Sequence, residues 1–473
     1  MSEKKYDFGL VGLGVMGRNF ILNVAENKFS AIGLDMDAEK AKAMDDEASQ
    51  HGFDAKGTTS KEEFVQSLKT PRVIMMLVPA GSPVDSVIND LLPMLEKGDL
   101  LIDGGNSFYT DTDRREKYLA EKGIHFMGAG VSGGAKGARL GPSIMPGGPE
   151  ESWQMVKPIF EAVAAKVNGE PCVTYIGPRS SGNYVKMVHN GIEYGLMQLI
   201  SEVYDFMKRG LGINIQQMHE TFRKWNDGKL HSFLMEITAK IFTKKDEYSD
   251  QPLVEMILDK GKQKGTGKWT SQNAMDLGVP LMTIDMSVNM REISALKDER
   301  IQAEKLYPVK PWKTSLSLDK EKTLMLLEDA LYFAYIISYS QGLSMLANAS
   351  EEYKYNLNLA EIAKIWRGGC IIRAALLEDF MQAYRQQPGL RNPLLSPIIA
   401  EKVMQVQGAA RQIAKDSLDM GIVMPCMLAS LAYFDAYRTA RLPLNLVQAQ
   451  RDFFGSHTYE RIDREGIFHT EWE

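Results

Sequence analysis

The N-terminal part of the chain alternates short apolar runs with helical stretches. Four apolar runs, each closed by Gly, Asp or Pro, lie at residues 8–13, 31–34, 73–78 and 100–102. Continuous apolar runs of this length are typical of parallel strands, because helices cover both faces of a parallel sheet. The pattern therefore predicts a doubly wound α/β domain over residues 1–179.

Beyond this region the pattern changes to long amphipathic segments, among them residues 184–209 and 323–347. Apolar residues recur at helical spacing in both segments, so we expect a large all-α domain over residues 180–440. Residues 441–473 are polar and irregular, and they are rich in Arg, aromatic residues and His. This composition is typical of an extended C-terminal tail that packs on a neighbour rather than of a core segment.

Composition narrows the possible function classes. The chain has 473 residues, of which 44% are hydrophobic, and it is long enough for two or three domains. A net charge of -6 argues against a nucleic-acid partner. Cys172, Cys370 and Cys426 lie far apart without metal-ligand spacing, which predicts free thiols in a reducing compartment and no metal site. The N-terminus shows neither a signal peptide nor a membrane helix, so we expect a cytoplasmic protein without a membrane partner.

A G-x-G-x-x-G motif directly follows the first predicted strand and opens the first predicted helix. Its residues are Gly12, Leu13, Gly14, Val15, Met16 and Gly17. The first glycine permits a tight turn, the second lets a pyrophosphate approach the backbone, and the third allows close helix packing. The helix N-terminus then presents free N–H groups to the phosphates. A strand before the motif and a helix after it favour a dinucleotide-binding, Rossmann-like domain over a plain turn.

Asp35, at the end of the second predicted strand, bears on the choice between NAD and NADP. An acidic residue at this point accepts hydrogen bonds from the ribose hydroxyls of NAD. A 2′-phosphate would meet a like charge, at a cost of about 4 kcal/mol for an effective dielectric constant of about 20. No Arg follows within several residues to offset this repulsion. The sequence therefore favours NAD, and the alternative is that Asp35 only caps a turn or faces solvent.

The most informative segment is a predicted helix that begins near residue 183. Five polar residues share one of its faces, at positions i, i+3, i+4, i+7 and i+8: Lys186, His189, Asn190, Glu193 and Tyr194. A solvated face is the ordinary explanation, but the other positions are mostly apolar and leave little of the helix for water. A Lys and a Glu two turns apart can act as base and acid on one small substrate. A Lys partly buried beside a cationic nicotinamide has a lowered pKa and can accept a hydroxyl proton.

Three further segments indicate a small anionic substrate. Residues 103–107 (DGGNS) and 131–139 (VSGGAKGAR) follow strand-like runs, which puts small polar groups at the carboxyl edge of the sheet, where ligands bind. Residues 261–269 (GKQKGTGKW) look like a phosphate loop but lack the Walker spacing, so ATP binding does not follow. Glycine-spaced Lys and Thr residues still bind a phosphate through side chains and backbone N–H groups.

Taken together, these motifs resemble those of the 6-phosphogluconate dehydrogenases, which belong to the β-hydroxyacid dehydrogenase superfamily. The matching segments are GLGVMGRN, DGGNS, SGGAKGARLGPSIMPGG, YVKMVHNGIEYG, QKGTGKWT and QAQRDFFGSHTYE. The resemblance implies oxidation of 6-phospho-D-gluconate by NAD(P)+ in the pentose phosphate pathway. The resulting 3-keto acid loses CO2 and yields D-ribulose 5-phosphate. It also implies a homodimer in which the C-terminal tail of one subunit enters the other.

The resemblance further implies roles for individual residues. Lys186 is similar to the general base on the hydroxyl at carbon 3, and Glu193 to the acid that protonates carbon 1 of the enediol. The implied sugar-acid contacts are Asn106, Ser132, Gly133, Gly134, His189 and Asn190. The implied phosphate contacts are Tyr194, Lys264, Thr266 and Arg291, joined by Arg451 and His457 of the partner subunit. Besides the glycine motif, the implied coenzyme contacts are Asp35, Met36, Asp37, Leu77, Val78, Pro79 and Asn106.

Two positions depart from the coenzyme pattern of this family. Most members carry Asn-Arg-Thr after the second strand, where this chain has Asp35, Met36 and Asp37, and the Lys that commonly follows Leu-Val is Pro79. Both departures remove cations from the site of a 2′-phosphate. The family default of NADP+ therefore gives way to an expectation of NAD+.

Two other functions are compatible with parts of this pattern. One is a related β-hydroxyacid dehydrogenase acting on an unphosphorylated acid, and the phosphate-binding residues and the Arg-containing tail argue against it. The other is an inactive dinucleotide-binding scaffold, which predicts the loss of Lys186 or Glu193. Both residues are present.

Overall fold

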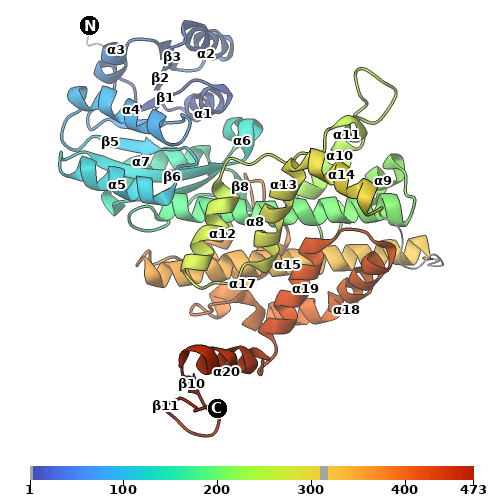
Figure 1. Ribbon diagram of the computed structural model, residues 1–473. Helices are drawn as coiled ribbons and strands as arrows, with labels where there is room; N and C mark the ends of the chain where they lie inside the picture. Colours follow the sequence, from blue (N-terminus) through green and yellow to red (C-terminus); the bar gives the residue numbers. More distant parts are fainter. Residues whose placement is uncertain (1–3, 309–317) are drawn as a thin grey trace.

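The computed structural model describes residues 4–308 and 318–473. A sheet-containing N-terminal domain, a helical domain and a projecting C-terminal arm follow one another along the chain (Figure 1). The predicted fold class, a Rossmann-like α/β domain followed by a large all-α domain, is confirmed.

The N-terminal domain is built on a seven-stranded sheet of order β3-β2-β1-β4-β5-β6-β7. The strands are β1 (Phe8–Val11), β2 (Ala31–Leu34), β3 (Ala55–Thr58), β4 (Val73–Met76), β5 (Leu100–Asp103), β6 (His125–Ser132) and β7 (Ser143–Gly147). The predicted parallel sheet thus ends in one antiparallel strand, because β7 pairs with β6 in the opposite direction. Strands β1, β2, β4 and β5 are buried along their whole length, as continuous apolar runs predict.

Helices cover both faces of this sheet, which confirms the doubly wound arrangement. One apolar cluster lies under α1 (Val15–Glu26), α2 (Ala38–His51), α6 (Gly134–Leu140) and α7 (Glu150–Val163). A second cluster, on the other face, lies under α3 (Lys61–Gln66), α4 (Ser82–Leu91) and α5 (Tyr109–Ala120). The carboxyl ends of the central strands therefore stay open for ligands.

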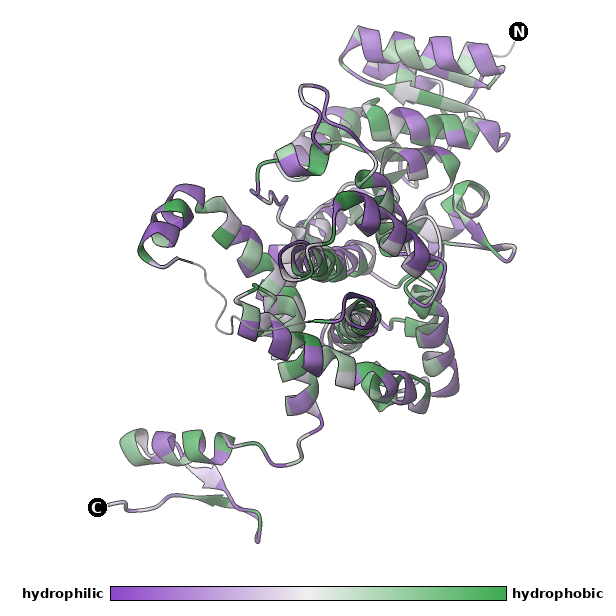
Figure 2. Ribbon diagram, turned by 90° about the vertical axis from the view of Figure 1, so that its right-hand side faces the viewer, coloured by the Kyte–Doolittle hydropathy of each residue, from purple (hydrophilic) through white to green (hydrophobic). Residues whose placement is uncertain are grey.

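The helical domain is organised around two long helices, α8 (Ser181–Asp205) and α15 (Lys320–Glu352). Both are largely buried, and Figure 2 looks approximately along them at the centre of the domain. The surrounding helices are α9 (Ile215–Asn226), α10 (Phe233–Ile241), α11 (Leu253–Met256), α12 (Thr266–Asp276), α13 (Met282–Ala295), α14 (Lys297–Leu306), α16 (Leu359–Ile365), α17 (Leu376–Gln386), α18 (Pro397–Met420) and α19 (Pro425–Tyr437). Shorter elements are η1 (Leu92–Met94), η2 (Phe206–Gly210), η3 (Pro393–Leu395) and a hairpin of β8 (Lys166–Val167) and β9 (Glu170–Pro171).

Glycines seat the start of α8 directly on the sheet. A Cβ atom added at Gly130 of β6 would lie 2.3 Å from the Cβ of Lys186, and one added at Gly182 would lie 2.3 Å from the carbonyl oxygens of Gly128 and Met145. Only glycine permits approaches this close. The contact fixes Lys186 over the edge of the sheet where β6 and β7 meet.

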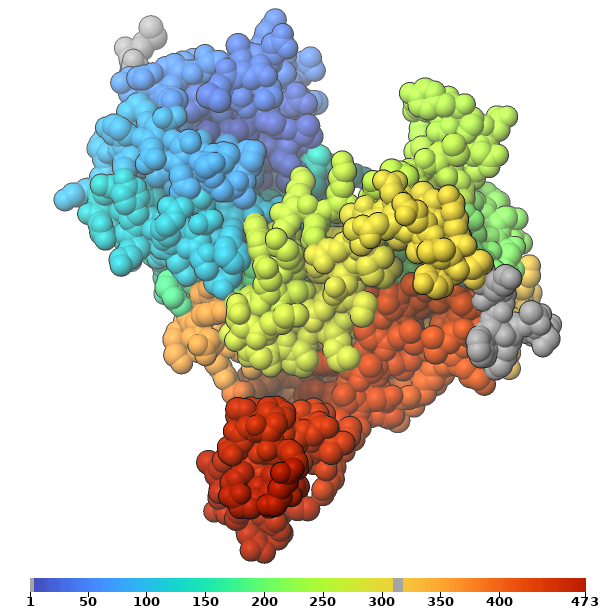
Figure 3. Space-filling model, viewed as in Figure 1, coloured from blue at the N-terminus to red at the C-terminus, as the bar shows by residue number. Residues whose placement is uncertain are grey.

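The C-terminal arm projects from the helical domain and contains regular secondary structure, which the polar, irregular sequence pattern did not indicate. It consists of α20 (Leu444–Gly455) and a hairpin of β10 (Tyr459–Glu460) and β11 (Ile467–Phe468). The carboxylate of Asp452 accepts hydrogen bonds from the N–H groups of Thr458 and Thr470 and from the indole of Trp472. This buried acceptor joins the helix to the hairpin. Figure 3 shows the arm as a lobe that stands apart from the helical domain.

Three expectations from the sequence concern membrane-spanning helices, free cysteines and metal sites. None of the helices in the described part of the chain combines the length and apolar character needed to span a bilayer. Cys172, Cys370 and Cys426 are buried and unpaired, as predicted. Among residues 4–308 and 318–473, no cluster of three or more His, Cys, Asp or Glu side chains could hold a metal ion.

Candidate active site

Helix α8 carries a buried polar face directly beside the sheet. Lys186 is 5% exposed and His189 is fully buried, whereas the Glu193 side chain is 21% exposed. The imidazole Nδ1 of His189 lies 3.9 Å from a carboxylate oxygen of Glu193 and 3.0 Å from Oδ1 of Asn190. An amine, an imidazole and a carboxyl group therefore share one partly enclosed surface.

The electrostatics of this surface bring its acid and base toward neutrality. Burial lowers the pKa of Lys186, against the opposing attraction of Glu193. Burial likewise raises the pKa of Glu193, against the opposing charges of Lys186 and Arg291. Burial and the Lys186 charge hold the pKa of His189 well below its ordinary value, so its imidazole is neutral. An amine with a lowered pKa and a carboxyl group with a raised pKa are suited to act as general base and general acid.

The loop after β6 contributes the second side of the site. The hydroxyl of Ser132 lies 3.3 Å from Nε2 of His189. Gly133 has a φ of 117°, and a Cβ atom there would lie 2.6 Å from the carbonyl oxygen of Gly369. The left-handed conformation and this close approach both require glycine. Gly134, the first residue of α6, is exposed at the rim.

A buried tryptophan supports the imidazole from behind. Trp366 is fully buried, and its ring meets the His189 ring edge-on with centroids 5.6 Å apart. The sequence analysis missed this contact because the two residues are far apart along the chain. An aromatic residue beside the glycines at 368 and 369 was the available signal.

The candidate phosphate-binding residues meet at the next turn of α8. The guanidinium of Arg291, on α13, lies 3.2 Å from the centroid of the Tyr194 ring. Thr266, the first residue of α12, accepts a hydrogen bond from Nδ2 of Asn190 at 3.1 Å. Lys264 is exposed on the loop before α12. Tyr194 thus contacts both Arg291 and the start of α12, and the charge of Arg291 acts on Glu193.

Arg451 and His457 do not join these residues within the same chain. Both are exposed on the projecting arm, and Figure 1 shows the arm separated from the N-terminal part of α8 by the rest of the helical domain. Their assignment to the site of a partner subunit stays a prediction.

The coenzyme half of the site fits a dinucleotide. A Cβ atom added at Gly17 would lie 1.8 Å from the Gly12 carbonyl oxygen, whereas one added at Gly14 would meet nothing within 4 Å. The first contact is the close helix packing that the motif requires, and the open space at Gly14 leaves room for a pyrophosphate. A cavity of about 130 Å³ opens beside it, lined partly by Gly12, Asp35, Met36 and Val78. Leu77 borders this region half-buried, and Val15, Asp37 and Pro79 are exposed around it.

Asp35 is held against the glycine motif by hydrogen bonds. Its carboxylate accepts the N–H of Leu13 at 2.8 Å and the N–H of Asp37 at 3.0 Å. The amine of Lys40 lies 3.8 Å from Asp35 and 3.6 Å from Asp37. Lys40 is a nearby cation that was not predicted from the sequence, where only an Arg was considered. Its position one helical turn after the N-cap Asp37 was the available signal.

Arg115 joins the segments that follow β4 and β5. This residue of α5 is 1% exposed, and it donates to the carbonyl of Gly81 at 3.0 Å and to Asp85 at 2.9 Å. It also lies 3.4 Å from Asp103, whose carboxylate accepts the Ser107 hydroxyl at 2.6 Å. The loop that carries the exposed Asn106 is therefore braced from within. Nothing in the amphipathic pattern of α5 separates Arg115 from a solvated arginine.

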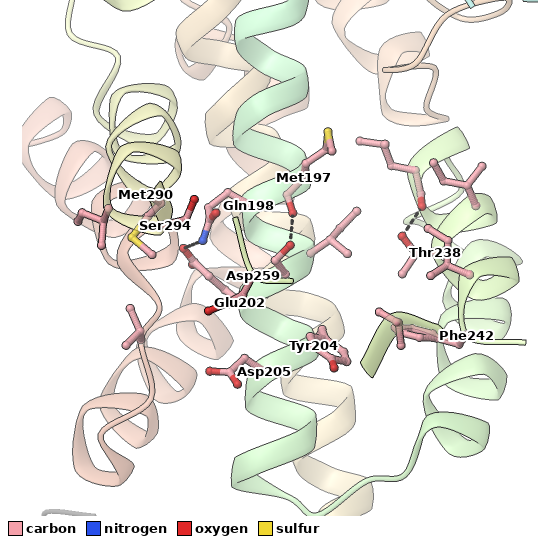
Figure 4. A pocket seen from close by; sticks show the side chains of 18 of the residues that line it. Met197, Gln198, Glu202, Tyr204, Asp205, Thr238, Phe242, Asp259, Met290 and Ser294 are labelled. Carbon is pink, nitrogen blue, oxygen red and sulfur yellow. Dashed lines mark hydrogen bonds between the residues drawn. The ribbon is translucent and has the colours of Figure 1, made fainter. Parts of the chain in front are cut away.

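A mainly apolar groove of about 710 Å³ continues along α8 beyond the candidate site (Figure 4). It lies among α8, α10 and α13. One end is formed by Met197, whose sulfur accepts a hydrogen bond from Arg291 at 3.8 Å. The groove therefore begins one turn past Tyr194, at the phosphate end of the site.

Comparison with known proteins identifies the family. Residues 7–177 match the NAD binding domain of 6-phosphogluconate dehydrogenase, and residues 182–472 match its C-terminal domain. The chain is 54% identical over 471 residues to the NADP(+)-dependent, decarboxylating 6-phosphogluconate dehydrogenase of Bacillus subtilis (strain 168), covering 99% of each chain. It is 48% identical to the decarboxylating 6-phosphogluconate dehydrogenase of Escherichia coli (strain K12), again covering 99% of each.

A solved structure agrees with this assignment. Plasmodium falciparum 6-phosphogluconate dehydrogenase, studied in its apo form and in complex with NADP+ and with 6-phosphogluconate, superposes with a TM-score of 0.95 at 45% identity. The match covers 98% of this chain and 100% of that chain. This chain therefore belongs to the 6-phosphogluconate dehydrogenase family.

Proposed function

We propose that this chain catalyses the oxidative decarboxylation of 6-phospho-D-gluconate to D-ribulose 5-phosphate and CO2, with NAD(P)+ as hydride acceptor. One observation carries the proposal: Lys186 and Glu193 lie on a single buried helix face, between a dinucleotide-binding edge and a cluster of phosphate-binding groups. The Bacillus subtilis and Escherichia coli relatives, both decarboxylating 6-phosphogluconate dehydrogenases, support the same reaction.

The residues of the site suit the successive proton movements of this reaction. Bound NAD(P)+ supplies the hydride acceptor. Neutral Lys186 accepts the proton of the hydroxyl at carbon 3, and its ammonium then hydrogen-bonds the new ketone. The carboxylate then leaves as CO2, the electrons of the broken bond pass to the ketone oxygen, and Lys186 returns its proton to that oxygen to give the enediol. Protonated Glu193 finally delivers a proton to carbon 1 of the enediol while Lys186 takes back the hydroxyl proton, which restores the ketone.

The remaining side chains would bind and orient the substrate. We assign the sugar acid to Asn106, Ser132, Gly133, Gly134, His189 and Asn190, and its phosphate to Tyr194, Lys264, Thr266 and Arg291. The stacking of Arg291 on Tyr194 supports the second assignment, because it pre-orients a cation that otherwise needs ordering. We likewise assign residues 1–179 to coenzyme binding, 180–440 to substrate binding and dimerisation, and 441–473 to the partner's site.

We infer that NAD+ is preferred over NADP+. Asp35 and Asp37 contribute two negative charges and Lys40 one positive charge at the position of a 2′-phosphate. The side chain of Asp37 also caps the N-terminus of α2, where it accepts the N–H of Glu39 at 3.0 Å. The helix end that could bind a phosphate thus already holds a carboxylate.

Initial rates with 6-phosphogluconate and each coenzyme test both inferences. We expect coenzyme reduction and CO2 release in equal amounts, with kcat/KM at least roughly 10-fold higher for NAD+ because of the like-charge repulsion. Asp35→Asn should lower the ratio of kcat/KM for NAD+ to kcat/KM for NADP+. Asp46→Asn removes the same charge from an exposed position on α2 and should leave this ratio unchanged. Reduction of neither coenzyme would refute the proposed reaction, and activity with NADP+ alone would refute the coenzyme preference.

We infer a homodimer in which the arm of one subunit lies in the groove beside α8 of the other. The arm exposes large apolar side chains, with Leu446 62% and Phe454 72% exposed, and the groove is mainly apolar. An arm in this groove would end beside Arg291, where Arg451 and His457 of the partner subunit could reach the phosphate. Burying both apolar surfaces would stabilise the pair.

Arg451→Ala is expected to raise the KM for 6-phosphogluconate by roughly 10-fold or more, because it removes one charge-assisted hydrogen bond to phosphate. Arg461→Ala is the matched control on the same arm, since Arg461 pairs with Asp463. The purified hybrid of one Arg451→Ala subunit and one Lys186→Met subunit should show a near-parental KM, because one of its two sites has both residues intact. A hybrid that keeps the raised KM would show that the arm serves its own chain.

A further inference from the structure

A single amide joins four segments of the protein next to the candidate active site. Asn273 of α12 is 3% exposed, and its Oδ1 accepts the hydroxyl of Tyr184, on α8, at 2.5 Å. Its Nδ2 donates to the hydroxyl of Tyr109, on α5, at 2.9 Å and to that of Tyr353, at the end of α15, at 2.7 Å. Both N–H bonds and the carbonyl of this side chain are therefore satisfied within the protein.

Asn273 is one end of a row of hydrogen bonds that docks α12 on α8. Thr266, Thr270 and Asn273 share one face of α12 at i, i+4 and i+7. Thr266 accepts from Asn190, and Thr270 donates to the carbonyl of Met187 at 2.9 Å. On α8 the row contacts Tyr184, Met187 and Asn190, which lie on the same stretch of the helix as the catalytic candidates. The row therefore sets the distance from Lys186 and Glu193 to the phosphate-binding end of α12.

The helices approach closely enough for this row because of two glycines. A Cβ atom added at Gly191 of α8 would lie 2.6 Å from Cγ2 of Thr270, and one added at Gly267 would lie 2.3 Å from the Tyr194 ring. Such contacts leave little freedom for α12 to slide along α8. The orientation of α12 therefore depends on what holds its far end, at Asn273.

At that far end, α12 meets the coenzyme domain. Tyr109 is the first residue of α5 and directly follows the loop that carries Asn106. The neighbouring Phe108 ring contacts the Trp269 ring of α12, with centroids 5.0 Å apart. A hydrogen bond and an aromatic contact thus join the loop of the coenzyme domain to the helix that begins at the phosphate-binding Thr266.

We propose that Asn273 is a positioning residue for the reaction, acting through its hydrogen bond to Tyr109. This inference rests on the proposed function and extends it to the joint between the two domains. Thr266 and Lys264 at one end of α12 anchor the substrate phosphate, and the Tyr109 contact at the other end ties α12 to the loop beside the coenzyme. The bond sets the reacting carbon against the hydride acceptor, where small displacements are costly.

Two matched variants separate positioning from stability. Tyr109→Phe and Tyr353→Phe each remove one hydroxyl from the same Asn273 amide and leave one buried N–H unpaired. Both should lower the melting temperature to a similar extent. Of the two variants, only Tyr109→Phe removes a hydrogen bond between the domains, so we expect its kcat to fall roughly 5- to 10-fold, the equivalent of one hydrogen bond, with Tyr353→Phe within twofold of the parent.

Calorimetric binding gives a readout that does not depend on turnover. In Tyr109→Phe the Kd of 6-phosphogluconate should be unchanged in the coenzyme-free protein and raised when reduced coenzyme is bound. Tyr384→Phe is the control for the substitution itself, because the Tyr384 hydroxyl is buried without a hydrogen-bond partner among the described residues. Its kinetics and binding should equal those of the parent.

The outcomes distinguish this inference from the proposed function. A parent protein that fails to oxidise 6-phosphogluconate would refute the reaction, and the binding measurements would still decide the role of Asn273. An active parent in which Tyr109→Phe and Tyr353→Phe lower kcat equally, or leave it unchanged, would refute positioning. In that case Asn273 only stabilises the tyrosine cluster.

Discussion

Replacing Lys186 with methionine is expected to lower kcat by roughly 10²- to 10⁴-fold, the usual contribution of a general base. Methionine keeps the buried aliphatic stem that packs on Gly130 but lacks the amine. Binding of 6-phosphogluconate should change much less than kcat, because the residues proposed to bind its phosphate do not include Lys186. The measurement is steady-state kinetics with saturating coenzyme.

The pH dependence of the rate tests the same assignment. Burial lowers the pKa of Lys186, so its amine becomes the neutral, proton-accepting form at a lower pH than an ordinary lysine. The rate of the parent should fall as the pH drops through this lowered pKa, and the residual rate of Lys186→Met should lose that limb. The apparent pKa obtained from this pH–rate profile belongs to the interacting pair of Lys186 and Glu193 and not to Lys186 alone.

A second lysine provides the control. Lys364 on α16 has a side chain that is 16% exposed and pairs with Glu361, so Lys364→Met removes another partly buried amine outside the site. It should retain near-parental kcat. If Lys186→Met keeps substantial activity and His189→Gln loses it, the base is the imidazole and the assignment to Lys186 is wrong.

Local sequence patterns predicted the fold where burial is uniform. The runs that became β1, β2, β4 and β5 are apolar throughout because both faces of each strand are covered. The edge strand β3 differs, because it has the sequence AKGT and is only partly buried. The antiparallel direction of β7 depends on its pairing with β6, which no local pattern encodes.

The candidate site divides in the same way. The polar face of α8 could be predicted because helical spacing alone brings its residues together. The contact between Ser132 and His189 joins residues 57 positions apart, and the brace of Arg115 and the amide of Asn273 join separate elements. Amphipathic spacing gives a buried arginine or asparagine the appearance of a solvated one, so these residues emerge only from tertiary contacts.

Replacing Glu193 with glutamine is expected to lower kcat by roughly 10²-fold or more by removing the acid that protonates the enediol. The preceding hydride transfer does not use this proton. We therefore expect the first turnover to reduce coenzyme at a near-parental rate, followed by slow steady-state turnover. Stopped-flow absorbance of the reduced coenzyme separates the two phases, and Lys186→Met should lack the fast one.

The pH profile of the glutamine variant follows from the environment of the carboxyl group. Burial raises the pKa of Glu193, so the group keeps its proton to a higher pH than an ordinary carboxyl. As the pH rises through that raised value, the acid form is lost and the parental rate should fall. Glutamine does not titrate, so the variant should lose the alkaline limb that belongs to Glu193.

Glu202 offers a matched control on the same helix. Its carboxylate is also buried, and burial raises its pKa to about 7, but its oxygens accept the N–H groups of Cys426 at 2.8 Å and Met427 at 3.0 Å. Glu202→Gln should therefore lower thermal stability and leave the two kinetic phases intact, because this carboxyl supports the start of α19 instead of facing the substrate. Equal slowing of the first turnover by Glu193→Gln and Lys186→Met would contradict separate acid and base roles for the two residues.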